Sequence, residues 1–193
     1  MCQTYFDACV QAGYPLNADF NGERQEGIGY HWLTQKGGER WGAESSYANP
    51  AKSRPNLEII TEARALEIVM DGKRAVGVRY EKGGEVRRID ARAEVILATG
   101  AFISPQLMML SGIGRPDELN RHGIAVKHAL DGVGRNLQDH IDTWVKQKAT
   151  TNHTYGISWG TMHTNAMHVL KWFAARRGMF TSNTGEAGGF VRS

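Results

Sequence analysis

Short runs of β-branched and aliphatic residues, separated by turn residues, fill the middle of the chain. These runs are residues 57–60, 65–70, 75–80 and 85–89. An Asp-Gly pair at 71–72 and a Gly-Gly pair at 83–84 stand between the later runs, and both pairs favour tight hairpin turns. The spacing therefore predicts an antiparallel β-meander.

A continuous apolar run, "AEVILATG" at residues 93–100, follows the meander. Such a run is typical of a strand that is buried on both faces of a parallel sheet. A Ser-Pro pair at 104–105 then predicts a helix with serine as N-cap, and Gly112 and Gly114 predict its end. Ligands bind at the carboxyl ends of strands in doubly wound sheets. On these residues alone, a nucleotide-type ligand and a purely structural turn are equal alternatives.

Helical spacing and capping residues predict further elements on either side of this corner. We expect helices over residues 6–13, 115–123 and 161–178, a short helix before Pro50 and a short strand over residues 29–34. The last residues, 181–193, are typical of the entry to another strand. The predicted fold class is α/β with α+β character.

Composition and charge narrow the function classes. The 193 residues are 41% hydrophobic and 22% charged, which is ordinary for a soluble globular protein. The formal charge of +3 arises within residues 151–193, where four basic residues face one glutamate. Because stacking aromatics are not interleaved with enough basic residues, we expect no nucleic-acid partner.

The two cysteines indicate a reducing compartment. Cys2 and Cys9 would lie roughly 10 Å apart along a helix axis, which is too far for a disulfide. No apolar run approaches the roughly 18 residues of a membrane-spanning helix, and we find no signal peptide. We therefore expect a cytoplasmic location, with peripheral attachment to the inner membrane as the alternative.

The other polar patterns do not predict a catalytic or metal site. His163 and His168 lie five residues apart without neighbouring carboxylates, so we predict no metal site. The Asp-His pair at 139–140 lacks a G-x-S-x-G nucleophile elbow, which favours a polar loop. The glycines of residues 112–123 follow a helix instead of a strand, so they do not form a dinucleotide fingerprint.

Residues 100–114, "GAFISPQLMMLSGIG", resemble the second signature of the glucose–methanol–choline (GMC) oxidoreductase family. The Gly-Ala start, the central Ser-Pro, two aliphatic positions and the closing Ser-Gly-Ile-Gly are all present. Four other stretches are similar to the choline dehydrogenase-like branch: residues 11–41, 71–80, 132–140 and 181–193. The resemblance covers essentially the whole chain.

The resemblance implies an internal fragment of an FAD-dependent enzyme. Residues 1–140 would be a partial FAD-binding, doubly wound domain without its N-terminal GxGxxG unit, and residues 141–193 the start of an antiparallel substrate-binding domain. The family oxidises a primary alcohol to an aldehyde by hydride transfer to flavin. No catalytic residue is assigned in this chain, because the catalytic His and its Asn or His partner are expected beyond residue 193.

The resemblance also implies which residues contact the cofactor and the substrate. Ala65 matches a position whose backbone meets the adenine end of FAD, and Thr99, Gly100 and Ala101 would approach the dinucleotide with their peptide groups. Glu186 matches a glutamate that faces the trimethylammonium group in choline-oxidising relatives, and a carboxylate suits a quaternary cation. The substrate would be choline or another primary alcohol, while the electron acceptor and oligomeric state stay open.

Two alternatives accompany this interpretation. One is an inactive, non-enzymatic remnant without flavin. The other is an NAD(P)H-linked flavoprotein reductase, although the Ser-Pro helix and its Ser-Gly-Ile-Gly end argue against it. We expect the 193-residue chain alone to be colourless and inactive, because it contains no pyrophosphate-binding glycine turn.

Overall fold

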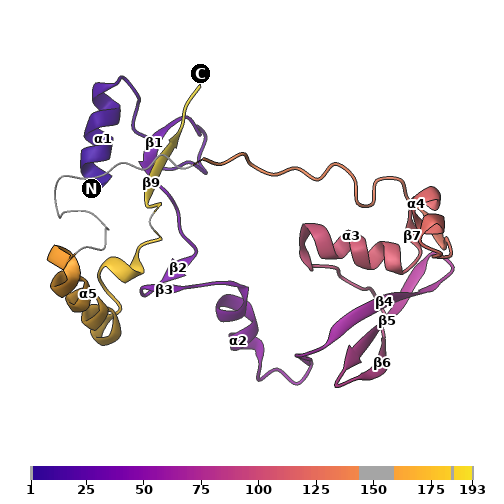
Figure 1. Ribbon diagram of the computed structural model, residues 1–193. Helices are drawn as coiled ribbons and strands as arrows, with labels where there is room; N and C mark the ends of the chain where they lie inside the picture. The colour runs from indigo at the N-terminus through magenta and orange to yellow at the C-terminus, as the bar shows by residue number, and fades with distance from the viewer. Residues whose placement is uncertain (1, 144–158, 184, 193) are drawn as a thin grey trace. The chain divides into compact units, whose positions relative to one another are not determined.

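The computed structural model of the chain describes residues 2–143, 159–183 and 185–192 (Figure 1). Among these residues, those up to 57 and those from 159 onward form one compact unit, here called the terminal unit. Residues 58–143 form the second, the central unit. The division expected between residues 140 and 141 stays a prediction, and part of the expected substrate-binding segment, residues 144–158, lies outside the described residues.

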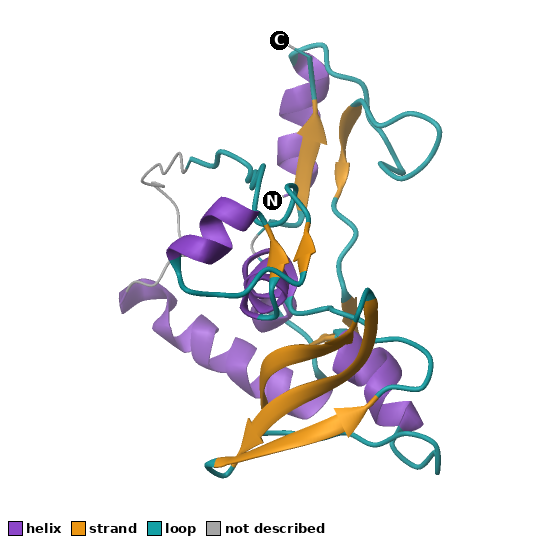
Figure 2. Ribbon diagram, turned by 90° about the vertical axis from the view of Figure 1, so that its right-hand side faces the viewer, coloured by secondary structure: helices purple, strands orange, loops and turns teal. Residues whose placement is uncertain are grey.

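The β-meander of the central unit has three strands. β4 (Arg64–Asp71), β5 (Arg74–Lys82) and β6 (Glu85–Asp90) pair antiparallel in that order, as one twisted sheet (Figure 2). The two predicted hairpin turns are confirmed, and their glycines adopt the positive φ angles that such turns require. The strand predicted over residues 57–60 is wrong. No hairpin turn joins that run to the next one, and no described strand pairs with it.

The apolar run at residues 93–100 does not form the predicted buried strand. No described strand pairs with residues 93–99, and Ile96 is 77% exposed. A strand of a parallel sheet is held by neighbours on its two edges, and here the run has none among the described residues. The hydrophobic pattern therefore correctly marks an apolar segment but not the local structure that it adopts in this chain.

Helix α3 (Gly100–Leu110) begins earlier than the Ser-Pro pair predicts, which corrects the assignment of the N-cap. The chain turns directly into the helix at Gly100, whose φ of 91° is accessible to glycine. The Ser104 hydroxyl lies 2.9 Å from Thr99 Oγ1 and accepts a hydrogen bond from Thr99 N, so it closes this turn from inside the helix. Pro105 lies within the helix, not at its first position.

The end of α3 is fixed to the meander by Ser111, which is 1% exposed. Its hydroxyl accepts a hydrogen bond from Ile68 N at 2.8 Å and donates to Leu107 O at 2.6 Å. Gly112, at φ 83°, comes so close to the next segment that a Cβ there would lie 2.5 Å from Ala125 O. The serine of the signature thus joins α3 to β4, against which the helix lies (Figure 1), and the glycine lets the chain pass close to residues 125–127.

A short parallel pair completes the central unit. β7 (Ile113–Gly114) pairs with β8 (His128–Ala129), and α4 (Pro116–Arg121) connects them. The predicted helix at 115–123 is confirmed, with proline first and glycine after its end. The buried apolar side chains of the central unit come from β4, α3, β7 and α4 and are Ile68, Leu107, Ile113 and Leu119.

The terminal unit is built around one antiparallel strand pair, which joins distant parts of the sequence. β1 (Gly27–Tyr30) pairs with β9 (Ala187–Phe190), and α1 (Cys2–Gln11) packs against β1. Its other elements are β2 (Gln35–Lys36), β3 (Glu39–Arg40), η1 (Glu44–Ala48), α2 (Asn49–Ala51), η2 (Trp159–Thr161), α5 (Met162–Ala175) and η3 (Met179–Thr181). Its buried apolar side chains are Phe6, Phe20 and Ile28.

The helices and strands predicted for the terminal unit are present, but their first or last residues differ from the prediction. The first strand occupies 27–30 instead of 29–34, and the short helix α2 follows the π-helical turn η1 directly and includes Pro50. Helix α5 ends at Ala175 instead of at Gly178, and the next residue, Arg176, adopts the left-handed conformation. None of the described helices combines the length and the apolar character that crossing a membrane requires. The mixture of helix and strand confirms the α/β class with α+β character.

Candidate functional site

The first turn of α3 presents unsatisfied backbone N–H groups. No side chain caps this helix, and the first N–H groups of any α-helix lack an intrahelical acceptor. At Gly100 the space that a Cβ would occupy is open, so a ligand could approach the backbone closely. Thr99, Gly100 and Ala101 therefore form a local arrangement that suits a polar or anionic group.

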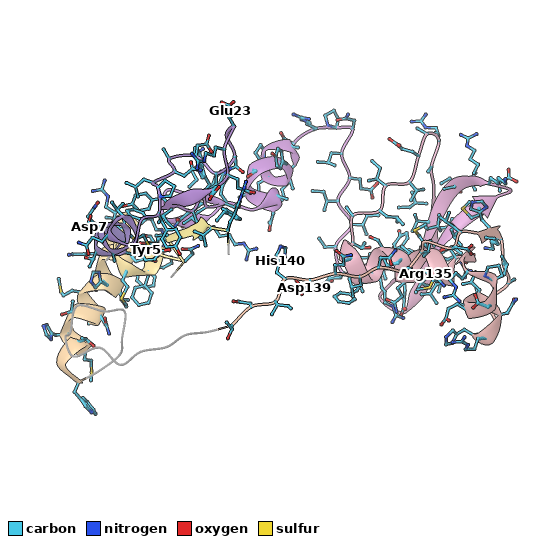
Figure 3. The ribbon with its side chains drawn as sticks, turned by 90° about the horizontal axis from the view of Figure 1, so that it is seen from above. Tyr5, Asp7, Glu23, Arg135, Asp139 and His140 are labelled. Atoms are coloured by element: carbon cyan, nitrogen blue, oxygen red, sulfur yellow. The ribbon has the colours of Figure 1, made fainter. Side chains whose placement is uncertain are left out.

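A cavity of about 680 Å³ lies beside the same turn of α3. One wall consists of Ala101, Phe102, Pro105 and Met109, and the other of the loop residues 134–138. Figure 3 shows Arg135 near α3 and Asp139 and His140 further along the same segment. The Asp139 carboxylate accepts a hydrogen bond from His140 N at 2.8 Å, as expected for a polar loop that bonds its own backbone.

Ala65 lies on β4, in register with Tyr80 of β5. β4 is an edge strand of the meander, so part of its backbone faces away from β5. A bulge between Ala65 and Glu67 interrupts the pairing at this position. All four residues predicted to contact the cofactor therefore belong to the central unit, and their contacts with the cofactor stay predictions.

Glu186 lies in the terminal unit, immediately before β9, and is half-buried. The thiol of Cys2, on α1, donates a hydrogen bond to Glu186 Oε2 at 3.4 Å. His31 N donates to Glu186 O, and His31 Nδ1 lies 2.9 Å from Gly185 O. Segments that are far apart in the sequence thus meet around one glutamate.

The electrostatic environment of this glutamate favours a cationic ligand. Among the described residues, no lysine, arginine or histidine forms an ion pair with Glu186. Partial burial and the contact with Glu186 raise the pKa of the Cys2 thiol, so the thiol stays protonated and donates. Within the described residues, the Glu186 carboxylate is therefore not paired with a cationic side chain.

Sequence reasoning did not identify Cys2 and His31 as neighbours of Glu186. The sequence distances are 184 and 155 residues, and the contacts depend on the pairing of β1 with β9. The only local signal is Gly188, because a Cβ there would lie 2.5 Å from His31 Nε2.

Within the described part of the chain, no group of three His, Cys, Asp or Glu side chains could hold a metal ion.

Comparison with known proteins places this architecture in a family. Residues 1–142 match the family model described as GMC oxidoreductase. The chain is 39% identical over 196 aligned residues to the alcohol dehydrogenase (acceptor) of Pseudomonas putida, an alignment that covers 100% of the chain and 35% of that protein. It is 42% identical over 189 residues to the mitochondrial choline dehydrogenase of Homo sapiens, with 98% and 32% covered. The chain thus spans about a third of the length of these curated relatives.

Solved structures show the same relationship. A formate oxidase structure aligns with a TM-score of 0.80 at 25% identity, over 98% of this chain and 33% of that chain. An FAD-dependent oxidoreductase from Chaetomium thermophilum aligns with a TM-score of 0.75 at 26% identity, over 93% of this chain and 32% of that chain. Because the family model matches well over half of the sequence, the chain belongs to the GMC oxidoreductase family.

Proposed function

We propose that the protein carrying this chain is an FAD-dependent alcohol dehydrogenase or oxidase that converts a primary alcohol to an aldehyde. The observation that carries the proposal is the identity of 39% and 42% to an alcohol dehydrogenase and a choline dehydrogenase over nearly the whole chain. Identity at this level along the full aligned length favours a shared reaction type over an inactive remnant.

The residues at the start of α3 suit contact with the dinucleotide part of FAD. The uncapped first turn of α3 offers backbone N–H groups, and the open space at Gly100 lets a ligand reach them. In this proposal Thr99, Gly100 and Ala101 hold the dinucleotide through their peptide groups, and the Ala65 backbone contacts its adenine end. When bound, the flavin supplies the acceptor for the hydride that leaves the carbinol carbon.

Glu186 supports choline as the favoured substrate within this reaction class. Among the described residues its half-buried carboxylate pairs with no cationic side chain, so it would attract the quaternary ammonium end of choline. The oxidation then removes a hydride from carbon and a proton from the hydroxyl, leaving a carbon–oxygen double bond. A neutral primary alcohol is the second candidate.

The test uses the intact protein and the visible absorption of its bound flavin. We expect a flavin spectrum that is bleached when choline or a neutral primary alcohol is added without oxygen, and aldehyde formed in equal amount. Bleaching by NADPH but not by alcohols would support the reductase alternative. A purified protein without flavin that oxidises no alcohol would support the remnant.

We also propose a reducing compartment as the protein's location. The support is the two cysteines, which are both free thiols in the structure. Cell fractionation, with thiol labelling before and after lysis, tests this proposal: both thiols are expected to be reduced in the soluble fraction.

A further inference from the structure

We propose that Cys2 is a positioning residue, whose thiol holds the Glu186 carboxylate in the orientation that meets the cationic end of a quaternary-ammonium alcohol. The inference rests on the proposed function, because it requires that Glu186 faces the substrate. It adds a second residue to the recognition of the cation, from a segment of the sequence in which the chemical motifs give no indication of a site.

The main chain at Glu186 is fixed by His31. The His31 backbone N–H donates to Glu186 O at 2.9 Å, and His31 Nδ1 lies at the same distance from Gly185 O. The imidazole ring lies directly against Gly188, where a side chain would collide with it. Two consecutive carbonyl groups are therefore held by one residue, and the remaining freedom at Glu186 is the rotation of its side chain.

The thiol restrains that side chain without cancelling its charge. Cys2 Sγ donates to Oε2 at 3.4 Å, and among the described residues no other group donates to this carboxylate. A thiol is a weak, neutral hydrogen-bond donor, whereas a lysine or arginine here would neutralise the carboxylate. In the part of the chain that the structure describes, no donor contacts the second oxygen, Oε1, so its lone pairs are available to a cation.

Cys2 itself is held in place by the packing of α1. Phe6, one helical turn further along, is buried and meets the Tyr30 ring of β1 edge-on, with 4.7 Å between the ring centroids. Figure 1 shows α1 beside the pair β1 and β9. Because the helix is anchored to the same strand that pairs with β9, the thiol and the carboxylate keep a fixed separation.

The first experiment tests the contact in the intact, FAD-loaded protein. Alkylation of each cysteine with iodoacetamide is followed by mass spectrometry at neutral pH. Because Glu186 disfavours the thiolate, Glu186→Gln should raise the alkylation rate of Cys2 several-fold. Cys9 lies on the same helix and serves as the internal control, with an unchanged rate. An unchanged Cys2 rate in Glu186→Gln would overturn the inference.

The second experiment separates positioning from a merely structural role. Cys2→Ala should raise KM for choline several-fold, leave kcat unchanged and leave KM for the uncharged carbon isostere of choline unchanged. Cys2→Ser, which keeps a donor, should restore most of the loss, and Cys9→Ala is the matched control with wild-type constants. An equal rise in KM for both alcohols, or no rise at all, would overturn the inference while leaving the proposed function intact. Failure of the proposed function gives a different result. The flavin of the wild-type protein then stays oxidised with every alcohol, which overturns the proposed function and the inference about Cys2 together.

Discussion

Ser111 stabilises the packing of α3 against β4, because its hydroxyl accepts a hydrogen bond from a backbone N–H of β4. Replacing it with alanine leaves Ile68 N buried without an acceptor. We expect Ser111→Ala to lower the free energy of unfolding by about 1–3 kcal/mol. Urea unfolding followed by circular dichroism measures the loss. Ser53→Ala, at an exposed turn, should change stability by less than about 0.5 kcal/mol.

Gly112 and Gly72 distinguish two physical reasons for a glycine at a given position. Both have positive φ, but only Gly112 lies against another backbone segment. Gly72→Ala should therefore cost about 1–2 kcal/mol for its left-handed conformation alone. Gly112→Ala adds the collision with Ala125 O and should cost clearly more. Equal losses in thermal unfolding would show that the close approach does not matter.

At the scale of single residues, the sequence predicts the local role of a residue, such as a turn glycine, better than it predicts the residue's tertiary contacts. Glycines at the hairpin turns were predicted because a tight turn needs positive φ and the turn is local. Ser104 was assigned as the N-cap from its position before proline, whereas Gly100 starts the helix. Cys2 and His31 gave no local signal, because their contacts with Glu186 arise from tertiary pairing.

Among the elements, β4 and β5 are tied to the segment before β8 by one glutamate. Glu67 Oε1 lies 2.7 Å from Lys127 Nζ and Oε2 lies 3.0 Å from Arg79 Nη1. The hydrogen bond from Lys127, with a further contribution from Arg79, holds the pKa of Glu67 below its usual value, although partial burial opposes the shift.

This lowered pKa predicts a specific acid dependence. The folded-state pKa lies below the unfolded one, so the stabilisation is complete above the unfolded value and is lost as pH falls through the folded value. At neutral pH, Glu67→Gln should reduce the free energy of unfolding by about 0.2–1 kcal/mol. The difference from wild type should shrink as pH falls below about 4. A difference that is constant with pH, or the same in Glu58→Gln, would contradict this.

Elements that are stabilised by local pairing were the ones that the sequence predicted well. The hairpins of the meander and α4 carry their turn and capping residues within a few positions, so the pattern contains the whole reason for the structure. The apolar run at 93–99 depends on neighbouring strands, and in the described chain it has none. The hydrophobicity of this run therefore predicted its preference for an apolar environment. It did not predict the conformation that the run adopts here.

For the whole molecule, the family could be inferred from the signature at residues 100–114, because several of its residues are required by the local backbone conformation and packing. Ser111, Gly112 and Gly100 are required by a buried hydrogen bond, a close approach and a positive φ. The substrate could not be inferred in this way. In the proposed function it depends on the surroundings of Glu186, which only the tertiary structure displays.

The exposed surface of the chain leads to a last prediction. Each unit exposes large apolar side chains among its described residues. Phe102 of α3 is 72% exposed in the central unit, and Phe173 of α5 is 70% exposed in the terminal unit. Such surface favours association in water.

We therefore expect the 193-residue chain, expressed alone, to self-associate and to bind an apolar dye. Sedimentation velocity over a concentration series should show species larger than the monomer. Phe102→Asp and Phe173→Asp should each reduce association, because a charge opposes burial of the patch. Ser53→Asp, at an exposed polar side chain, is the control and should have no effect. A monomer at every concentration would mean that these side chains are covered within the chain, which would contradict the prediction.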